Sequence, residues 1–484
     1  MVEPLVQTHP GIVRSLGVQG WQHLDPVILA ALATRSPLLL VGRHGTAKSL
    51  LVERISAALG LSWRHYNASL INYDDLIGIP LPDESGETLR FVTTPGSIWD
   101  AEFVFFDEIS RCRSDLQNKL FPIIHERRVS GIRLEKLQHR WAAMNPPSPD
   151  DVEDQAGQYY LGSEPLDPAL ADRFPFIIQV PTWSELSEED RRQIINWKEG
   201  DQFSDFDPAQ ALENHPLSDY VARCREYIPA LEEQMAGWLA DYVLYVIDLL
   251  EKARLPQSPR RARMLARNIV AVHAARMILE GEETDLDTSV ESALTYSLPE
   301  NASEVPPSPA NIVAAHKQAW EISVLDEDDD MRQVFMAPDP AQRVLLADQL
   351  DIDDARISRL ITQLLGSQTS EARRVGLAAA IFLAYREKRD LTSAAWEPLA
   401  QLASRVLEPR VMSAAPQPGA AQTIWQSITN WLAKSTDRTS LRARLEHNYV
   451  LGGFPDLWTK ENWETALKQF QADLDRFDLK EAAE

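Results

Sequence analysis

The segment from Gly42 to Ser49, Gly-Arg-His-Gly-Thr-Ala-Lys-Ser, constrains this chain more than any other feature. It follows a short apolar run, Pro37–Val41, that is typical of a strand buried on both faces. It precedes Ser49–Leu59, which has apolar residues at helical spacing. Main-chain N–H groups in such a loop, together with the positive end of the helix dipole, favour an anion. The strand–loop–helix context therefore predicts a phosphate-binding loop rather than a chance glycine-rich turn.

The residues of this loop have separate expected roles. Lys48 would contact the β- and γ-phosphates of ATP, and the Ser49 hydroxyl would bind Mg²⁺. Ala47 stands where the general pattern has glycine, which is acceptable if the residue has a negative φ. His44 could touch the phosphates, and a variable exposed position is the alternative. The predicted nucleotide-binding set in this loop is Gly42, Arg43, His44, Gly45, Thr46, Ala47, Lys48, Ser49 and Leu50.

Two apolar runs downstream each end in polar residues suited to ATP chemistry. Phe103–Phe106 is followed by Asp107 and Glu108, which is a Walker B pattern. Asp107 would bind Mg²⁺, and Glu108 would act as the general base that polarises the attacking water. Trp141–Met144 is followed by Asn145, which would contact the γ-phosphate or hold that water. An asparagine that only forms a turn before proline is the alternative, but the order of the three elements favours the functional interpretation.

Strand and helix signals alternate through residues 1–186, which predicts an α/β domain around a parallel sheet. A further buried strand is expected at Phe176–Val180. Strand signals then fade, and residues 187–298 are predicted to form a helical domain. Residues 299–335, which include a proline-rich stretch, are predicted to be a linker. Residues 336–484 are expected to be an all-helical region that binds a partner or cargo.

The formal net charge of −24 bears on the kind of partner. Nucleic acid or an anionic membrane would repel such a surface unless one face were locally basic, so we expect protein partners instead. No apolar run approaches the length that crosses a bilayer, and the first residues show no signal-peptide pattern. The only two cysteines, Cys112 and Cys224, suggest no disulfide framework, so a cytoplasmic location is expected.

The order of the motifs resembles that of the MoxR family of AAA+ ATPases, in the helix-2-insert clade. The resemblance spans roughly residues 11 to 275 and implies an αβα nucleotide-binding domain, a helical lid, ATP and Mg²⁺ as cofactors, and ATP hydrolysis. The segments that carry it are the P-loop with its alanine, Phe105-Phe106-Asp107-Glu108-Ile109, Met144-Asn145-Pro146, Leu170-Ala171-Asp172-Arg173-Phe174 and, for the helix-2 insert, Asp75-Leu76-Ile77-Gly78 with Pro95-Gly96.

The resemblance also implies a homo-oligomer, a hexameric ring with ATP held between neighbouring copies. Arg173 is then the candidate arginine finger that reaches the neighbour's γ-phosphate, and Arg111 is the alternative. An ion pair between Arg173 and Asp172 would be an ordinary structural role for that arginine. A protein client that is remodelled, and a partner that carries a von Willebrand factor A domain, are implied by the same resemblance.

A second basic contact is expected at the start of a later helix. Ser258-Pro259-Arg260 resembles the sensor 2 segment of the family, and proline suits a first helical turn. Arg260 is the candidate for the nucleotide contact, and Arg261 and Arg263 remain alternatives. A solvated basic helix start would be the purely structural explanation for any of the three.

Three other functions share the same loop. One is a metal-chelatase-like AAA+ motor subunit, which co-purification with a chelatase core would favour. A nucleic-acid-directed AAA+ ATPase is disfavoured by the charge of −24, and salt-sensitive DNA binding would restore it. The third is an ATP-dependent assembly scaffold, which would have no need of the general base Glu108.

One apolar stripe near the end of the chain has two interpretations. Trp463, Leu467, Phe470, Leu474 and Phe477 recur at three- and four-residue steps, which places them on one helical face. Such a face could dock on a partner, but packing within its own domain is favoured because globular helices routinely bury one face.

Overall fold

A computed structural model of the chain describes most of the sequence. The chain divides into two compact units, unit 1 over residues 1–324 and unit 2 over residues 325–484. Each unit has its own hydrophobic core. The described residues are 11–82, 89–147, 166–196, 212, 215–281, 283–325, 329–337, 339–409, 420–435, 437, 439–452, 454, 457 and 463–477.

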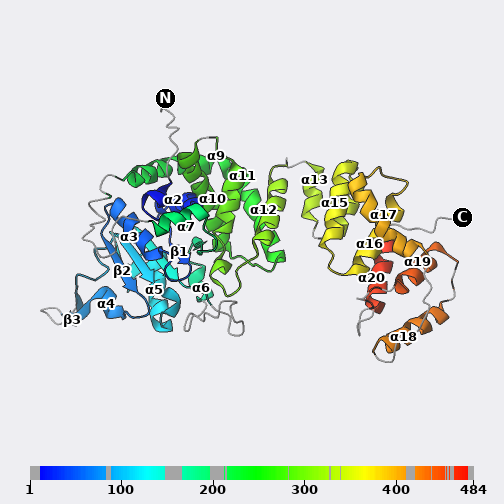
Figure 1. Cartoon of the computed structure of the whole chain (residues 1–484), viewed down its shortest axis with the longest axis horizontal. Helices are drawn as coiled ribbons and strands as arrows, with labels where there is room; N and C mark the ends of the chain where they lie inside the picture. The colour runs from blue at the N-terminus through cyan, green and yellow to red at the C-terminus, as the bar shows by residue number, and fades with distance from the viewer. Residues whose placement is uncertain are drawn as a thin grey trace. The chain divides into compact units, whose positions relative to one another are not determined.

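Unit 1 is built on a five-stranded parallel sheet with the strand order β2-β5-β8-β1-β9. The middle strands consist almost entirely of buried residues, because helices cover the sheet on both faces (Figure 1). Its strands are β1 (Leu38–Val41), β2 (Trp63–Asn67), β5 (Phe103–Asp107), β8 (His139–Met144) and β9 (Phe176–Gln179). The predicted α/β fold with a parallel sheet is therefore confirmed.

Four of these strands coincide with the runs predicted from the sequence, but β2 was not predicted. Its sequence, Trp-Arg-His-Tyr-Asn, is neither an apolar run nor an alternating one. Among the strands that the structure describes, β2 pairs only with β5 at the edge of the sheet, and most of its residues are partly exposed. An edge strand can be held by main-chain pairing without a continuous apolar pattern.

Alternate residues of each strand point to opposite faces, and one face packs on α5 (Ser114–Glu126). On this face Leu39 and Ala142 share a core with Leu120 and Ile123 of that helix. The other helices around the sheet are α1 (Ile12–Ser15), η1 (Gln22–Leu24), α2 (Asp25–Ala33), α3 (Lys48–Ala58), α4 (Tyr73–Ile77), η2 (Ile109–Arg111), α6 (Pro168–Ala171) and α7 (Glu188–Ile195).

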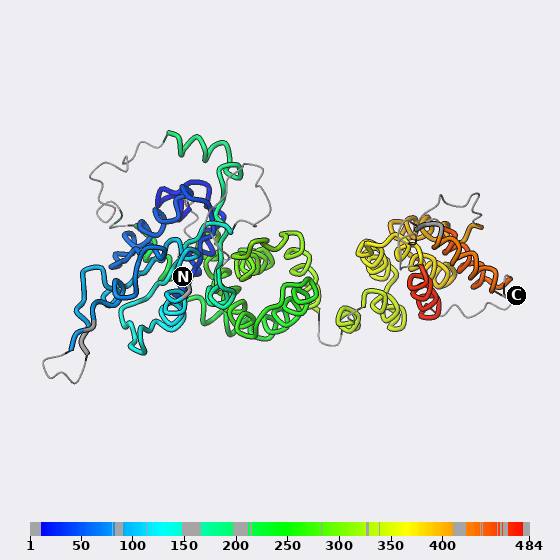
Figure 2. Tube along the Cα trace, turned by 90° about the horizontal axis from the view of Figure 1, so that it is seen from below, coloured from blue at the N-terminus to red at the C-terminus, as the bar shows by residue number. Residues whose placement is uncertain are grey.

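Two antiparallel hairpins interrupt this α/β order. One pairs β6 (Arg128–Val129) with β7 (Ile132–Arg133). The other pairs β3 (Ile79–Pro82) with β4 (Leu89–Val92), follows α4, and extends away from the sheet (Figures 1 and 2). Gly78 begins this second hairpin with φ 87, and a Cβ there would lie 2.4 Å from the main-chain oxygen of Val92. Glycine is therefore required where the chain leaves α4.

The remaining helices of unit 1 correct one sequence expectation. Residues 299–335 were predicted to be a linker, but they contain a helix, α12 (Pro309–Ser323), that packs on α9 (Leu217–Lys252). The reason is a helical spacing of buried residues, Ile312, Ala315, Ala319 and Ile322, after the proline-rich stretch. The remaining helices of unit 1 are α9 (Leu217–Lys252), α10 (Pro259–Glu280), α11 (Leu286–Thr295), η3 (Pro299–Ala302) and α12 (Pro309–Ser323).

In the part of unit 2 that the structure describes, every regular element is a helix. The apolar stripe of α20 is buried in the core of this unit, as favoured above; Phe470, for example, is 1% exposed. In neither unit do the described residues include a helix long and apolar enough to span a membrane. The helices of unit 2 are α13 (Asp330–Met336), α14 (Pro340–Gln349), α15 (Asp354–Ser367), α16 (Glu371–Tyr385), α17 (Ser393–Leu407), α18 (Ala420–Lys434), α19 (Leu441–Val450) and α20 (Trp463–Arg476).

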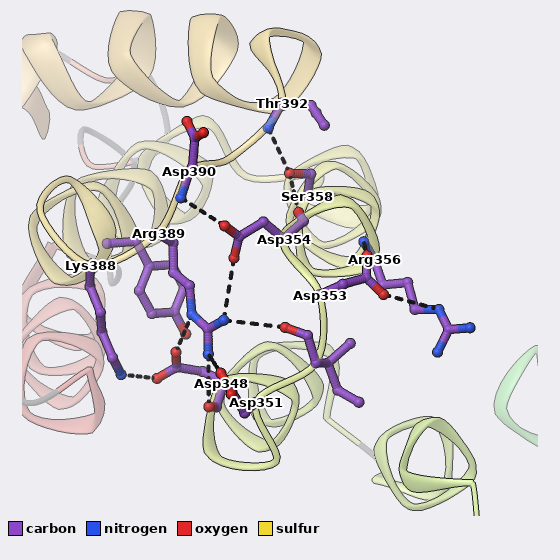
Figure 3. Close-up of polar contacts among 12 residues, drawn as sticks. Asp348, Asp351, Asp353, Asp354, Arg356, Ser358, Lys388, Arg389, Asp390 and Thr392 are labelled. Atoms are coloured by element: carbon purple, nitrogen blue, oxygen red, sulfur yellow. Dashed lines mark hydrogen bonds and ion pairs between the residues drawn. The ribbon is translucent and has the colours of Figure 1, made fainter.

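A network around Arg389 joins the ends of several helices in unit 2 (Figure 3). Its guanidinium lies 2.9 Å from a carboxylate oxygen of Asp348 and 3.3 Å from one of Asp354. It also donates to the main-chain oxygens of Asp348 and Ile352. The side chains of Arg389 and Asp348 are only 11% and 10% exposed. This arginine therefore ties the α14–α15 connection to the end of α16 by charge-assisted hydrogen bonds.

We expect Arg389→Ala to lower the free energy of unfolding of unit 2 by about 2–4 kcal/mol, because Asp348 would lose a nearly buried partner. Hydrogen exchange of peptides from α14 to α16 in the full chain measures this effect. The control is Arg386→Ala, just after α16, whose side chain is 48% exposed and, among the described residues, forms an ion pair only with its neighbour Glu387. It should change stability by less than about 0.5 kcal/mol. Equal protection in the two variants would contradict a stabilising role for the network.

Candidate functional site

The predicted phosphate-binding loop leaves the C-terminal end of β1 and leads directly into α3. The main-chain N–H of Gly42 donates to the oxygen of Met144 at 3.0 Å, which fixes the loop to the end of the neighbouring strand β8. A Cβ at Gly42 would lie 1.9 Å from Val180, so the residue must be glycine where the loop passes the end of β9. Thr46 closes the loop by donating its hydroxyl to the oxygen of Arg43 at 2.7 Å.

The condition under which alanine would be readily accepted at position 47, a negative φ, is not met. Ala47 is the N-cap of α3 and has φ 67 and ψ 19, in the left-handed region. The turn from the loop into the helix imposes this conformation, which costs a residue with a Cβ about 1–2 kcal/mol. Two residues earlier Gly45 has φ 75, and no atom lies within 4 Å of the position that its Cβ would take. The centre of the loop is therefore open to a ligand on one side.

We expect Ala47→Gly to raise the free energy of unfolding of unit 1 by roughly 0.5–1 kcal/mol, because glycine adopts a positive φ without strain. Denaturant unfolding followed by the fluorescence of the tryptophans measures it. Ala57→Gly, inside the same helix, is the matched comparison and should lower the stability by up to about 1 kcal/mol. If both glycine substitutions destabilised the chain equally, Ala47 would not be strained.

Lys48, the first residue of α3, is buried, and its ammonium group turns back into the loop. Its Nζ donates to the oxygens of Gly42 at 2.7 Å and Arg43 at 2.8 Å. Burial lowers the pKa of this lysine, while the nearby carboxylates of Asp107 and Glu108 act in the opposite direction. The cation is thus held inside the loop that would surround phosphate groups.

A hydroxyl and a carboxylate meet beside this lysine. The Ser49 hydroxyl donates to Oδ2 of Asp107 at 2.8 Å, although the two residues lie on α3 and at the end of β5. Burial by itself raises the pKa of Asp107, but hydrogen bonds from His65, Ser49 and the N–H of Glu108 lower it, and the pKa lies below its ordinary value. Asp107 is therefore ionised at neutral pH, and a hydroxyl with an ionised carboxylate is a donor set that suits Mg²⁺.

The next residue, Glu108, is held by two side chains. Asn145 donates its amide to the Glu108 carboxylate at 3.3 and 3.4 Å, and Nε of Arg111 lies 3.3 Å from Oε2 of the same group. Asn145 is only 4% exposed, and it follows the end of β8, which neighbours β5 in the sheet. The sheet order thus brings together the glutamate and asparagine predicted to act on water. Arg111, the alternative finger, pairs with the glutamate of its own chain.

A cavity of about 620 Å³ adjoins the phosphate-binding loop. Residues 43–47 and Leu50 form one wall, and His44 is exposed in it. The opposite walls come from segments that sequence reasoning missed, namely Gly17–Gln19 before α2 and Pro181–Ser184 after β9. Val18 and Trp183 supply apolar surface there. No motif marked these residues, because they meet the loop only through the fold.

Arg173 and Arg260 lie elsewhere, at the N-terminal end of β9, whereas Gly42 lies at its C-terminal end. The guanidinium of Arg173 stacks on the ring of Phe121 at 4.4 Å and donates to the oxygen of Ala169. Asp172 pairs with Arg260 at 3.0 Å rather than with Arg173. Both arginines therefore stand apart from the loop of their own chain.

The two other sensor 2 candidates differ sharply in exposure. Arg261 is 2% exposed and donates to the main-chain oxygen of Phe174 at 2.6 Å, which is a structural role. Arg263 is exposed to solvent. Arg260, with a side chain that is 46% exposed, is the one that combines accessibility with an anchoring ion pair.

The residues present fit MgATP on three grounds. The loop is open above Gly45, the Ser49–Asp107 pair offers oxygen ligands to a cation, and the adjoining cavity has room for a nucleoside. Glu108, held beside this pair, is placed to act on a water molecule. The arrangement can therefore bind a nucleoside triphosphate and assist attack of water on its terminal phosphate.

The part of the chain that carries this site is similar to known proteins. Residues 37–174 match the AAA domain of the dynein-related subfamily, a domain that implies nucleotide binding. The chain is 30% identical over 181 residues to Chaperone MoxR1 of Mycobacterium tuberculosis, a stretch that covers 37% of this chain and 44% of that protein. A crystal structure of an inferred ATPase from Cytophaga hutchinsonii aligns with 60% of this chain and 84% of its own, at 19% identity and a TM-score of 0.39. Residues 37–174 thus match an AAA domain, and part of the chain is distantly homologous to MoxR1, of whose length it spans less than half.

Proposed function

We propose that this chain is an AAA+ ATPase of the MoxR-like kind that uses ATP hydrolysis to remodel a protein client. The observation that carries the proposal is the meeting of Ser49, Asp107, Glu108 and Asn145 beside Lys48, at the C-terminal ends of neighbouring strands. A binding module needs only the loop and the cation site. A glutamate held over that site by two further side chains favours catalysis.

The chemistry that follows assigns one task to each residue. When bound, MgATP supplies the γ-phosphoryl group and a cation that offsets its charge. Lys48 would hold the β- and γ-phosphates, and Ser49 with Asp107 would hold the cation. Glu108 would accept a proton from the water that attacks the γ-phosphorus as the bond to the bridging oxygen breaks. Asn145 would orient that water and the carboxylate.

We propose that the active form is a ring, in which Arg173 acts on the nucleotide of the neighbouring copy. The support is the position of Arg173 at the end of β9 remote from its own loop, where a second copy could receive it. We expect Arg173→Ala to bind ATP normally and to lose turnover by roughly a hundredfold or more. Steady-state phosphate release measures turnover, and Arg128→Ala, an exposed arginine on β6, is the control.

Rings that mix two variants distinguish a role of Arg173 at the nucleotide of a neighbouring copy from a structural role within its own copy. Rings that combine Arg173→Ala with Lys48→Ala should regain part of the activity, because some interfaces would hold an intact loop and an intact arginine. No recovery in rings shown to be mixed would count against the trans arrangement.

The client and partner are inferred more indirectly. By resemblance, we propose that a protein with a von Willebrand factor A domain works with this chain and that unit 2 contacts a partner or cargo. Unit 2 supports this by forming a compact unit with its own core.

The first experiment measures ATPase turnover and particle mass together, with and without ATP. Turnover accompanied by an ATP-dependent increase in mass would support the proposed ring ATPase. Assembly without turnover would favour a scaffold. Tight nucleotide binding without assembly or turnover would contradict both the proposed ring and the proposed hydrolysis.

A further inference from the structure

A second cavity, of about 560 Å³, lies at the edge of the sheet opposite the phosphate-binding loop. Pro37 and Pro175, which line it, stand just before β1 and β9, whereas the loop follows β1. Its described lining includes no aspartate or glutamate but holds six arginines. These pocket arginines are Arg35, Arg127, Arg140, Arg173, Arg225 and Arg267.

The pocket arginines lack counter-charges. In the described part of the chain, none of them forms an ion pair with a carboxylate, although the chain as a whole has a net charge of −24. Burial and then the charge of Arg127 lower the pKa of Arg140 to about 9. Burial and then Arg35 lower the pKa of Arg225. The like charges of these arginines repel one another and so lower their pKa values. An anion bound between them would reduce this repulsion.

Helix capping explains part of the cluster. Arg225 donates to the oxygens of Ala33 at 2.8 Å and Leu32 at 3.4 Å, and Arg267 to that of Thr34 at 3.3 Å, so both satisfy the C-terminal end of α2. That end carries roughly half a negative charge. It therefore cannot balance the pocket, and capping does not explain why further arginines converge there.

Arg35 and Arg127 show most clearly that capping is insufficient. Within the described residues their side chains make neither a hydrogen bond nor an ion pair. They stand after α2 and α5 in the left-handed region, with φ 52 and 56, where glycine would be less strained by about 1 kcal/mol. Two unpaired arginines at strained positions on separate elements thus face one cavity.

We propose that the pocket arginines bind a polyphosphate group. Arg140 and Arg173 also donate to main-chain oxygens, but these acceptors are neutral. Several guanidinium groups around a small cavity favour an anion with several charges in little volume, and guanidinium pairs bidentately with phosphate oxygens. A nucleic-acid duplex contacts an extended basic face, whereas this site is a concavity. The group could be free in solution or belong to a nucleotide on a second copy. Binding of a free polyphosphate goes beyond the proposed function, whereas a nucleotide on a second copy would rest on the ring proposed above; neither case depends on turnover.

The test uses the full chain with Lys48→Ala, which disables the other phosphate site, and tripolyphosphate as the probe in calorimetry. Arg35→Gly with Arg127→Gly removes two charges and suits both backbone conformations, so the fold should persist. Arg254→Gly is the matched control, because Arg254 is exposed, has φ 64 and lies outside the cavity. We expect the double variant to bind about a hundredfold more weakly, and the control to bind normally.

A second arm identifies the source of the phosphate. If the Lys48→Ala chain does not bind tripolyphosphate, ATP-dependent self-association is compared between the double variant and Arg254→Gly with Lys48 intact. Loss in the double variant alone would assign the group to a nucleotide held by another copy. Equal behaviour of the double variant and the control in both arms overturns the proposal, whether or not the wild-type chain hydrolyses ATP.

Discussion

Lys48→Ala is expected to abolish nucleotide binding. The ammonium group lies inside the loop, 2.7 and 2.8 Å from the oxygens of Gly42 and Arg43, where it can exchange these acceptors for phosphate oxygens. Loss of two charge-assisted hydrogen bonds of about 1.5–3 kcal/mol each weakens binding by roughly a hundredfold or more. Titration with a fluorescent ATP analogue in the presence of Mg²⁺ measures the change in Kd.

The control for this result is Lys136→Ala. Lys136 is an exposed lysine of the same domain that pairs with Asp100 at 2.7 Å, and its removal should leave nucleotide affinity unchanged. Because Lys48 is buried, Lys48→Met keeps most of its packing and tests whether a weak Kd reflects the lost charge or a disturbed fold. If a folded Lys48→Met variant bound ATP with the affinity of the wild type, the assignment of this loop to the nucleotide site would be contradicted.

Local patterns were sufficient to predict the buried strands that precede the candidate site residues. The apolar runs before Gly42, Asp107 and Asn145 predicted three buried strands, and parallel strands place their carboxyl ends at one edge. The proximity of Glu108 and Asn145 then follows from the strand order, in which β5 and β8 are neighbours. The roles of Glu108 and Asn145 could therefore be predicted from the sequence, whereas their contact depends on the strand order of the folded sheet.

What the sequence could not supply depends on conformation and on long-range packing. The left-handed φ of Ala47 belongs to the turn into α3, and residue type alone suggests the opposite sign. The cavity walls around Val18 and Trp183 come from segments far apart in the chain that carry no motif. The helix at residues 309–323 begins directly after a proline-rich stretch. Such a stretch is typical of a linker, and it obscured the helical spacing of the apolar residues that follow.

The cluster of pocket arginines also depends on long-range packing and could not be predicted from the sequence. Arg35, Arg127 and Arg225 are separated by long stretches of sequence, and only Arg127 has an adjacent basic residue, Arg128. Only the packing of α2, α5 and α9 around one end of the sheet brings them to a common cavity. A net charge of −24 disfavoured anionic partners on average, yet the average says nothing about a local concentration of arginine.

The second large effect is expected for Glu108→Gln, which should bind ATP as tightly as the wild type and lose turnover by roughly a hundredfold to ten-thousandfold. Glutamine keeps the shape and can still pair with Asn145, but it cannot accept a proton from water. Glu108 has φ 55, so a substitution that preserves size also avoids a change in the strained turn after β5. Single-turnover phosphate release isolates the chemical step from product release.

Glu102→Gln supplies the matched control, because Glu102 precedes the opposite end of the same strand and accepts a hydrogen bond from the N–H of Ser62 at 3.0 Å. It should turn over normally. If Glu108→Gln also turned over normally, Glu108 would not be the base, and its contacts with Asn145 and Arg111 would serve structure alone. If both variants bound ATP and only Glu108→Gln were inactive, the carboxylate would be needed for the reaction itself, because the two substitutions remove the same charge, one at each end of the same strand.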